Sequence, residues 1–448
     1  MQNSDIRWRS ENLTMATVYD LCVVGAGLVG SAAARHATLG TGDEAKARVC
    51  LVGPLEPKTK DVTSSRTIFG CHYDEGRIIR DIDPCVTWSV LASHSIQRFR
   101  DIEKVSGYIP HVRHTGIQFF SEVGFIWSGT DGNETLNDVG NTKEAKETDT
   151  ARRLTAAELQ NLFPYFNYGK HDLGFYQKTN GGHISPRRMV LAQQTAAKQQ
   201  GCDVIYEVVT QVVEDKMADE NVMEVKTESG RCILAKKVLL ATNAFTNLCD
   251  LLPRGQRLNM WSYPSCVAFV EISEESAKRL SGMPPVIYRG KGAEDWKPPA
   301  EAIGTSDDYA FYMLPPIRYP DGRFYMKQGC YHNLTPALET LEDMKAWYCN
   351  PPPRELVLNT ASVMTSFVKG IEPLSITGDT CTTAYTPSKH PYIDKISENL
   401  TVAVGGNGRA AKSADEIGRL GMELALNGRW DTDLPREKFR VILANPKL

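Results

Sequence analysis

Six residues near the start of the chain have the spacing of a loop that binds a dinucleotide. They are Gly25-Ala26-Gly27-Leu28-Val29-Gly30, set between the apolar run 21–24 and the alanine-rich run 31–36. The first glycine permits a tight turn, the second lets the backbone approach a pyrophosphate, and the third lets the helix pack closely on the strand. The free N–H groups of that helix would face the phosphates. The pattern predicts a nucleotide site, the alternative being a glycine-rich turn in an ordinary α/β unit.

A second apolar strand, 49–52, completes a β-α-β unit with this loop. In dinucleotide folds an acidic residue ends this strand and binds the ribose hydroxyls. Here Gly53 occupies that position, and Glu56 is the next acidic residue. Glu56 could reach the ribose or be a solvated loop residue, so the binding of the adenosine half stays open.

The remaining elements would bring distant segments to this unit. Ser185 and Pro186 have the residue types of a helix start and predict a helix over 186–200. Strand signals follow at 204–206, 208–213, 222–226, 238–241, 309–314 and 323–328, while 130–133 and 141–149 are typical of exposed loops. Near its end the chain repeats the pattern of strand, glycine turn and helix, with a strand at 400–404, glycines Gly405, Gly406 and Gly408, and a helix at 413–427.

Composition indicates an ordinary globular protein of two domains. The chain has 448 residues, of which 42% are hydrophobic and 23% charged, and a formal net charge of -3. No long run of one charge sign occurs, so a nucleic-acid partner is not expected. The longest apolar stretch, 21–34, is too short to span a bilayer. We expect a soluble monomer that acts on a small molecule.

Eleven cysteines without a C-x-x-C pair or a secretory signal favour a reducing compartment and no metal site. Residues 1–14 are polar and predict a flexible extension or a weak targeting leader. The last three residues, Pro446-Lys447-Leu448, resemble the peroxisomal tripeptide with Pro in place of Ser. The expected location is therefore cytoplasmic or peroxisomal, with a random basic tail as the alternative reading of the C-terminus.

Several separated motifs together resemble the flavin-dependent amine oxidases of the sarcosine oxidase and pipecolate oxidase group. The resemblance covers about 19–428 and rests on the glycine loop, the run 237–245, the segment 381–387 with His390 and Ile393-Asp394, and Gly406-Asn407-Gly408. It implies an α/β fold with a discontinuous, Rossmann-like FAD-binding domain over 15–90, 175–250 and 370–440. The substrate domain, over 91–174 and 251–369, would be α+β and built on a mixed antiparallel sheet.

The resemblance also implies roles for single residues. Cys381, six positions before Pro387, matches the cysteine that bonds covalently to the flavin, although a buried cysteine is by default a small hydrophobe. Lys327 resembles the lysine that stabilises charge on oxygen as it is reduced, but a lysine on the wet face of a strand is common. Tyr312 matches a tyrosine beside the substrate, where an aromatic face suits an amine cation, and could equally be a core residue.

Other family positions are less well kept. The family's active-site histidine corresponds to Tyr331 or His332, since the spacing is one residue longer here. Gly70 stands where an arginine would clamp a substrate carboxylate, and Thr383 where a tyrosine would stand. The carboxylate-binding lysine would be Lys412, or otherwise Arg409 is the nearer cation. The implied cofactor-binding residues are Gly25, Gly27, Leu28, Val29, Gly30, Ser65, Arg66, Cys381, Gly406, Gly408 and Lys412, and the implied catalytic residues are Lys327, Tyr312, His332 and Lys412.

The implied activity is oxidation of a secondary or tertiary amine, an N-alkyl or cyclic amino acid derivative, with FAD as cofactor and oxygen as electron acceptor. Hydride would leave the carbon next to nitrogen, and the products would be an imine and hydrogen peroxide. The departures at Gly70 and Thr383 predict a substrate that is bulkier than sarcosine or lacks an α-carboxylate. The alternatives are a flavin dehydrogenase with another acceptor and a flavoprotein that serves as an assembly factor.

Overall fold

The computed structural model describes residues 17–39, 46–109, 112–113, 116–146, 150–215, 222–292, 309–329 and 336–445. The predictions for residues 1–14, Tyr331, His332 and the C-terminal tripeptide lie outside these ranges. Within them, no helix combines the length and the apolar character needed to cross a membrane.

The first sheet has a parallel centre that joins segments from both ends of the chain. Its strands are β1 (Val18–Val24), β2 (Val49–Val52), β11 (Asp203–Ile205), β12 (Val209–Asp215), β13 (Val222–Thr227), β14 (Cys232–Leu240), β20 (Tyr392–Lys395) and β21 (Leu400–Val404). β1 pairs in parallel with β2 and β14, and β14 pairs in parallel with β21. The runs 21–24 and 49–52 are fully buried, as strands with helices on both faces must be.

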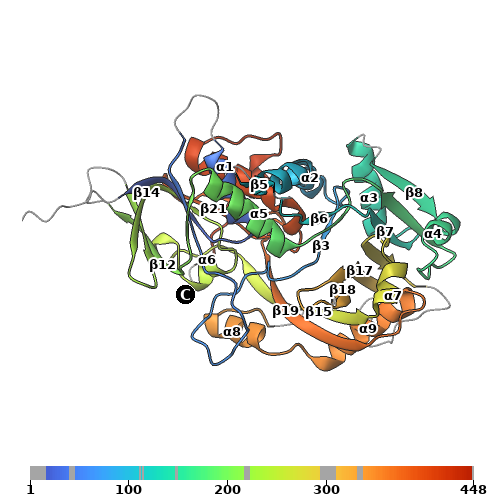
Figure 1. Ribbon diagram of the computed structural model, residues 1–448. Helices are drawn as coiled ribbons and strands as arrows, with labels where there is room; N and C mark the ends of the chain where they lie inside the picture. The colour runs from blue at the N-terminus through green and yellow to red at the C-terminus, as the bar shows by residue number, and fades with distance from the viewer. Residues whose placement is uncertain are drawn as a thin grey trace, which may run out of the picture.

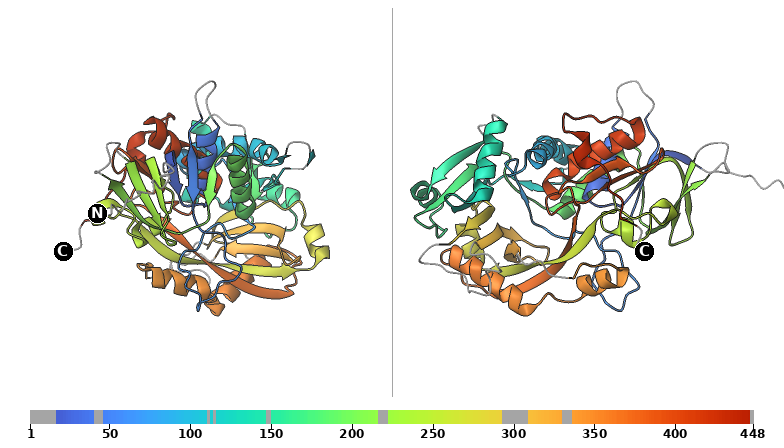
Figure 2. Two further views of the ribbon diagram at one scale, coloured as in Figure 1. Left: turned by 60° about the vertical axis from the view of Figure 1, so that its left-hand side comes forward. Right: turned by 180° about the vertical axis from the view of Figure 1, so that it is seen from behind.

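The second sheet is mixed and almost wholly antiparallel. Its strands are β7 (Phe125–Thr130), β8 (Ala151–Thr155), β9 (Asp172–Gln177), β15 (Trp261–Ile272), β16 (Val286–Gly290), β17 (Tyr309–Arg318), β18 (Phe324–Gly329) and β19 (Ser375–Tyr385). Only β16 and β7 pair in parallel. In Figure 1 the first sheet lies at the upper left, while the second extends from β15, β18 and β19 at the bottom to β7 and β8 at the right; Figure 2 shows the two sheets from further sides. The predicted fold class, a Rossmann-like unit beside an α+β unit on a mixed sheet, is confirmed.

Two small sheets and the helices complete the fold. The small strands are β3 (Arg77–Ile79), β6 (Phe120–Ser121) and β10 (Gly182–Ile184) in one sheet, and β4 (Tyr108–Ile109) and β5 (Val112–Arg113) in the other. The helices are α1 (Leu28–Thr38), α2 (Val86–Ser106), α3 (Glu134–Ala145), α4 (Ala156–Leu162), α5 (Pro186–Gln199), α6 (Phe245–Leu248), α7 (Glu274–Arg279), α8 (Leu341–Cys349), α9 (Arg354–Phe367) and α10 (Ala414–Met422). Short 3₁₀ turns span Pro253–Gly255, Ala411–Ser413 and Arg436–Phe439, and a π-helical turn, Glu423–Asn427, follows α10.

One sequence expectation was wrong. The run 141–149 was expected to be an exposed loop, but α3 extends through Ala145; residues 147–149 lie outside the described ranges. Its N-cap, Asn133, accepts a hydrogen bond from the Thr135 N–H, and Leu136 and Val139 are buried on one face. Apolar spacing of three to four residues therefore outweighs the polar composition of this segment.

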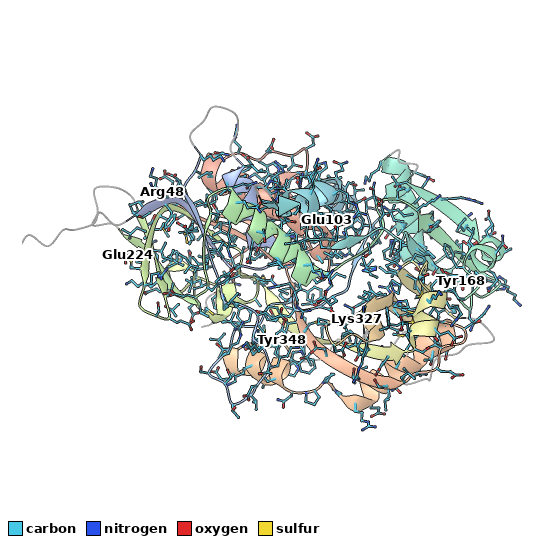
Figure 3. All side chains as sticks on the ribbon, viewed as in Figure 1. Arg48, Glu103, Tyr168, Glu224, Lys327 and Tyr348 are labelled. Carbon is cyan, nitrogen blue, oxygen red and sulfur yellow. The ribbon has the colours of Figure 1, made fainter. Side chains whose placement is uncertain are left out.

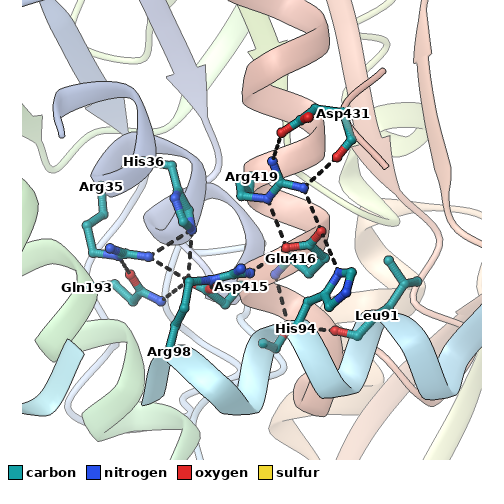
Figure 4. A network of polar contacts seen from close by, with 11 residues as sticks. Arg35, His36, Leu91, His94, Arg98, Gln193, Asp415, Glu416, Arg419 and Asp431 are labelled. Carbon is teal, nitrogen blue, oxygen red and sulfur yellow. Dashed lines mark hydrogen bonds and ion pairs between the residues drawn. The ribbon is translucent and has the colours of Figure 1, made fainter. Parts of the chain in front are cut away.

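A buried ionic network fixes α10 against the helices around it (Figure 4). Asp415 accepts hydrogen bonds from Arg35 at 2.9 Å and from Gln193 at 2.9 Å, and pairs with Arg98 at 2.6 Å. Glu416 pairs with Arg419 at 2.7 Å. Since every partner is charged or polar, both buried carboxylates are compensated. The network thereby fixes the helix that follows the second glycine turn.

Candidate functional site

The glycine loop forms a cradle in which two of the three glycines leave no room for a side chain. Gly25 has φ of +109°, and a Cβ there would lie 2.6 Å from the Ala241 carbonyl oxygen at the end of β14. A Cβ on Gly30 would overlap the Gly25 carbonyl oxygen. At Gly27, by contrast, the nearest atom to an added Cβ is a His72 nitrogen at 3.7 Å. Gly25 and Gly30 therefore shape the turn, while Gly27 leaves open space in front of the α1 N-terminus.

A cavity of about 220 Å³ lies at this turn, at the carboxyl ends of the parallel strands. Such ends are where ligands bind in open α/β sheets. Five of the predicted cofactor residues line it: Gly25, Gly27, Leu28 and Val29 from the glycine loop, and Gly406 from the C-terminal turn. The other main segments of its wall are 52–54, 68–73, 208–209, 241–245 and 403–405. Gly30 and Gly408 are absent from the lining, although Gly408 has φ of +68° and so helps to form the turn.

The position of Gly53 has a steric reason. A Cβ at Gly53 would lie 2.5 Å from the backbone nitrogen of Ala26 in the glycine loop. An acidic side chain therefore has no room there. Glu56, the other candidate for the ribose, has both carboxylate oxygens bound by Arg187 at 2.7 Å. The negative charge of Glu56 is therefore already paired with Arg187 of α5.

Arg66 holds the loop that covers one side of the cavity. Its guanidinium donates to the carbonyl oxygens of Ile68 and Leu55, both at 2.7 Å, and to the Tyr73 hydroxyl at 2.9 Å. Neither Ser65 nor Arg66 belongs to the cavity lining. Their contact with a cofactor phosphate stays a prediction.

Lys327, labelled in Figure 3, lies on β18. It is fully buried in a cluster of charged groups. Its ammonium group pairs with Asp74 at 2.5 Å and donates to the Gly76 carbonyl oxygen. Asp74 also pairs with Arg77 and accepts a hydrogen bond from Tyr319 at 2.9 Å. Burial, and then the charge of Arg77, hold the pKa of Lys327 well below its usual value. The segment 68–77 links this cluster to the cavity, because 68–73 line the cavity and Arg77 donates to the Cys71 carbonyl oxygen.

Two thiols lie near the cavity and Lys327. Cys381 is on β19 opposite Ser265, and burial raises the pKa of its thiol, while Arg77 and Lys327 act to lower it. Cys71 is exposed and belongs to the cavity lining, and its sulfur lies 3.5 Å from both the Thr382 carbonyl oxygen and the Tyr348 hydroxyl. The sequence predicted a covalent bond to the flavin for Cys381 and gave no indication of a role for Cys71.

A second cationic cluster surrounds the buried Asp83. Its carboxylate contacts Arg409 at 2.9 Å, Arg80 at 3.0 Å and Lys412 at 3.4 Å. Burial alone would raise the pKa of Asp83, but these three cations together lower it. Burial lowers the pKa of Lys412 to about 7. The sequence left Lys412 and Arg409 as alternatives, and the fold brings both to the same carboxylate.

Tyr312 lies on β17 against Gly329 of β18, where any side chain would overlap its ring. It packs with Ile78 of β3 against a group that includes Trp127 and Ile287. The guanidinium of Arg80 lies 5.1 Å from the Trp127 ring centre. β3 thus brings cations and apolar side chains to the second sheet.

Sequence reasoning missed the arginines of β3 and their partners, chiefly Asp74, Arg77 and Arg80. It looked for a carboxylate-binding arginine at Gly70, whereas the segment 77–80 has arginines at both ends. The two arginines that flank the apolar pair 78–79 were the available signal. The contact with Lys327, however, joins residues about 250 positions apart, and no local pattern records it.

The residues at the cavity fit FAD. The cradle excludes side chains at Gly25 and Gly30, the α1 N-terminus offers free N–H groups, and an apolar wall continues along 208–209 and 403–404.

Comparisons with known proteins agree with this geometry. The family model described as DAO, FAD dependent oxidoreductase, matches residues 20–424. Monomeric sarcosine oxidase from Streptomyces avermitilis is 25% identical over 197 residues, which are 43% of this chain and 44% of that protein. The match thus spans less than half of that relative.

Two solved structures have the same fold. NikD, described as an unusual amino acid oxidase essential for nikkomycin biosynthesis, superposes with a TM-score of 0.69 at 19% identity, covering 96% of this chain and 99% of its own. L-proline dehydrogenase from P. horikoshii superposes with a TM-score of 0.68 at 17% identity, covering 95% and 97%.

Proposed function

The chain belongs to the FAD dependent oxidoreductase family, and we propose that it oxidises a secondary or tertiary amine and passes the electrons to oxygen, releasing hydrogen peroxide. The observation that carries the proposal is the buried Lys327, whose ammonium group is kept charged by its ion pair with Asp74 and which the segment 68–77 links to the cavity. When bound, FAD supplies the acceptor for the hydride that leaves the carbon next to nitrogen.

We assign FAD to the unit of residues 15–90, 175–250 and 370–440, and the substrate to 91–174 and 251–369. The N–H groups at the α1 N-terminus would bind the pyrophosphate, and Gly406 would let the backbone approach the cofactor. Ser65 and Arg66 would help to hold the phosphates. Lys327 would place a fixed charge where oxygen becomes negative during its reduction.

We infer that the substrate is an N-alkyl or cyclic amino acid that carries a carboxylate. Arg80 and Arg409 already exceed the single charge of Asp83, so they and the partly protonated Lys412 leave a net positive charge beside the apolar group around Tyr312. An anionic substrate group would balance it. This revises the expectation drawn from Gly70, since cations on β3 and near α10 supply what that position lacks. The aromatic face of Tyr312 would hold the amine, and exclusion of water would favour its unprotonated form.

One observation favours a dehydrogenase with another electron acceptor as the second candidate. Asp74 pairs directly with Lys327, and this pairing reduces the field that the cation exerts on oxygen. An oxidase yields one peroxide for each imine, whereas a dehydrogenase yields little.

The function is tested by adding candidate amines to the yellow protein without oxygen. We expect N-alkyl and cyclic amino acids to bleach the flavin absorbance, and their esters to do so at least about tenfold more slowly, because an ester cannot pair with the cations. Peroxide per imine formed is then measured in air. Failure of every amine to bleach the flavin would contradict the proposal and favour an assembly role. Equal rates for acids and esters would contradict only the carboxylate.

Covalent attachment of the flavin through Cys381 is tested with acid-denatured protein. We expect the yellow colour to stay with the precipitate of the wild type and to wash out of Cys381→Ser, because serine cannot form the thioether. Cys71→Ser is the matched control, since Cys71 lines the cavity, whereas Cys381 is only next to the lining residue Thr382. If the colour washes out of Cys71→Ser and stays with Cys381→Ser, the bond belongs to Cys71 and the assignment to Cys381 is wrong.

A further inference from the structure

A cysteine and a histidine that the proposed reaction does not use lie in contact beside the first sheet. Cys85 is the N-cap residue of α2, and its sulfur lies 3.6 Å from Nε2 of His390. His390 lies between β19 and β20, just before Pro391 of the cavity wall. Their contact joins segments 305 positions apart.

The other ring nitrogen fixes the orientation of His390. Nδ1 lies 2.6 Å from the Ser388 carbonyl oxygen, which can only accept a hydrogen bond. Nδ1 therefore carries the hydrogen, and in the neutral ring Nε2 offers its lone pair to the thiol. The loop is held in turn by the Thr386 hydroxyl, which donates to the His390 carbonyl oxygen at 2.6 Å. The Cys85 thiol thus contacts a base, the His390 ring, and the Ser388 carbonyl oxygen orients that base.

The surroundings of Cys85 favour a negative sulfur. It lies at the N-terminus of a 21-residue helix, and the backbone N–H groups of Thr87 and Trp88 stabilise the thiolate. Lys438 lies nearby, 3.3 Å from the Thr87 hydroxyl. The facing acid is Asp83, which accepts the Cys85 backbone N–H at 3.1 Å and is itself balanced by the three cations around it.

Cys85 differs in this respect from the other thiols. Burial would raise its pKa, but the hydrogen bond with His390 and the backbone N–H groups lower the pKa to about 7. For the other described cysteines with a shifted pKa, the shift is upward; they are Cys50, Cys202, Cys232, Cys249, Cys349 and Cys381. Cys85 is also a partly exposed residue, and its contact with His390 is only partly buried.

We propose that Cys85 is a modification site, a thiolate held by His390 that attacks small electrophiles and above all hydrogen peroxide. The sulfur lone pair bonds to one peroxide oxygen while the O–O bond breaks, which oxidises the thiolate to a sulfenic acid. The departing hydroxide takes the proton of the His390 imidazolium and leaves as water. Sulfur thus gives up two electrons, and peroxide accepts them. The inference rests on the proposed function only for the source of peroxide, which would be the enzyme's own product.

The test uses the resting holoenzyme without amine, so its outcome is independent of the proposed function. Iodoacetamide alkylation at pH 7.0 is followed by peptide mass spectrometry, with the exposed Cys232 as internal control. We expect Cys85 to react roughly fivefold faster or more, since its larger thiolate fraction outweighs the lower nucleophilicity of a more acidic thiol. Added hydrogen peroxide with dimedone should label Cys85 and not Cys232.

His390→Asn is the decisive variant, because its amide can still donate to the Ser388 carbonyl while the base is removed. We expect it to slow alkylation of Cys85 at pH 7.0 severalfold and to leave the rate at pH 9.5 undiminished, where the thiolate forms without help. A merely buried or misfolded thiol would be slow at both pH values. Equal alkylation of Cys85 and Cys232, or no effect of His390→Asn at pH 7.0, would overturn the proposal.

Discussion

Lys327→Met is expected to slow the reaction of the reduced enzyme with oxygen by about a hundredfold or more, while anaerobic reduction by the amine changes little. A fixed cation aimed at developing charge is worth roughly 10² to 10³ in rate. The amine half of the reaction develops no negative charge on oxygen, so it does not need this group. Stopped-flow mixing of reduced enzyme with oxygen, followed by flavin absorbance, measures the effect.

The structure predicts that this variant still folds. Removing Lys327 does not leave Asp74 alone, because Arg77 still pairs with it and Tyr319 still donates to it. Lys236→Met is the matched control, since that lysine is exposed in the middle of β14 and pairs with Asp20 of β1. If reoxidation of Lys327→Met stays within about threefold of the wild type, Lys327 has no role with oxygen. Equal slowing of both half-reactions would indicate a structural role instead.

The variant Asp74→Asn tests the same ion pair by removing the charge of its acidic partner. If the carboxylate restrains the cation, its removal should leave reoxidation as fast as in the wild type or faster. The pairing of Lys327 with Asp74 is therefore the point at which an oxidase and a dehydrogenase of this fold could differ.

The parallel sheet could be predicted because its signals are local. An apolar strand before Gly25, and another before Gly405, are each complete within a few residues. The prediction of helix α5 was correct at its start and off by one residue at its end. Its start is a local signal, because Ser185 caps the helix by accepting a hydrogen bond from the Arg188 N–H. The parallel pairing of β1 with β2 then follows from the rule that the two strands of a β-α-β unit lie parallel and adjacent.

The polar part of the site could not be predicted in the same way. Asp74 meets Lys327, and Asp83 meets Arg409, across hundreds of positions, and each contact depends on where β3 lies between the two sheets. A buried charge is tolerated only with its partner. Sequence indicates that charged residues are present, while the fold decides which of them meet.

Gly27→Ala is expected to weaken FAD binding roughly tenfold to a hundredfold without destabilising the protein. The added methyl group would meet nothing closer than a His72 nitrogen at 3.7 Å, and Gly27 has φ of -87°, which alanine adopts without strain. The methyl group would point into the space before the α1 N-terminus and hold the pyrophosphate away from the N–H groups. The expected loss of binding free energy is about that of one charge-assisted hydrogen bond.

Two further glycine variants serve as controls. Gly30→Ala, whose methyl group would overlap the Gly25 carbonyl oxygen, should lose both stability and FAD. Gly282→Ala, with nothing within 4 Å, is the neutral control. Flavin titration and thermal unfolding of the apoproteins, all on a Cys381→Ser background, measure the two effects separately. Full FAD affinity in Gly27→Ala would place the pyrophosphate elsewhere in the cavity.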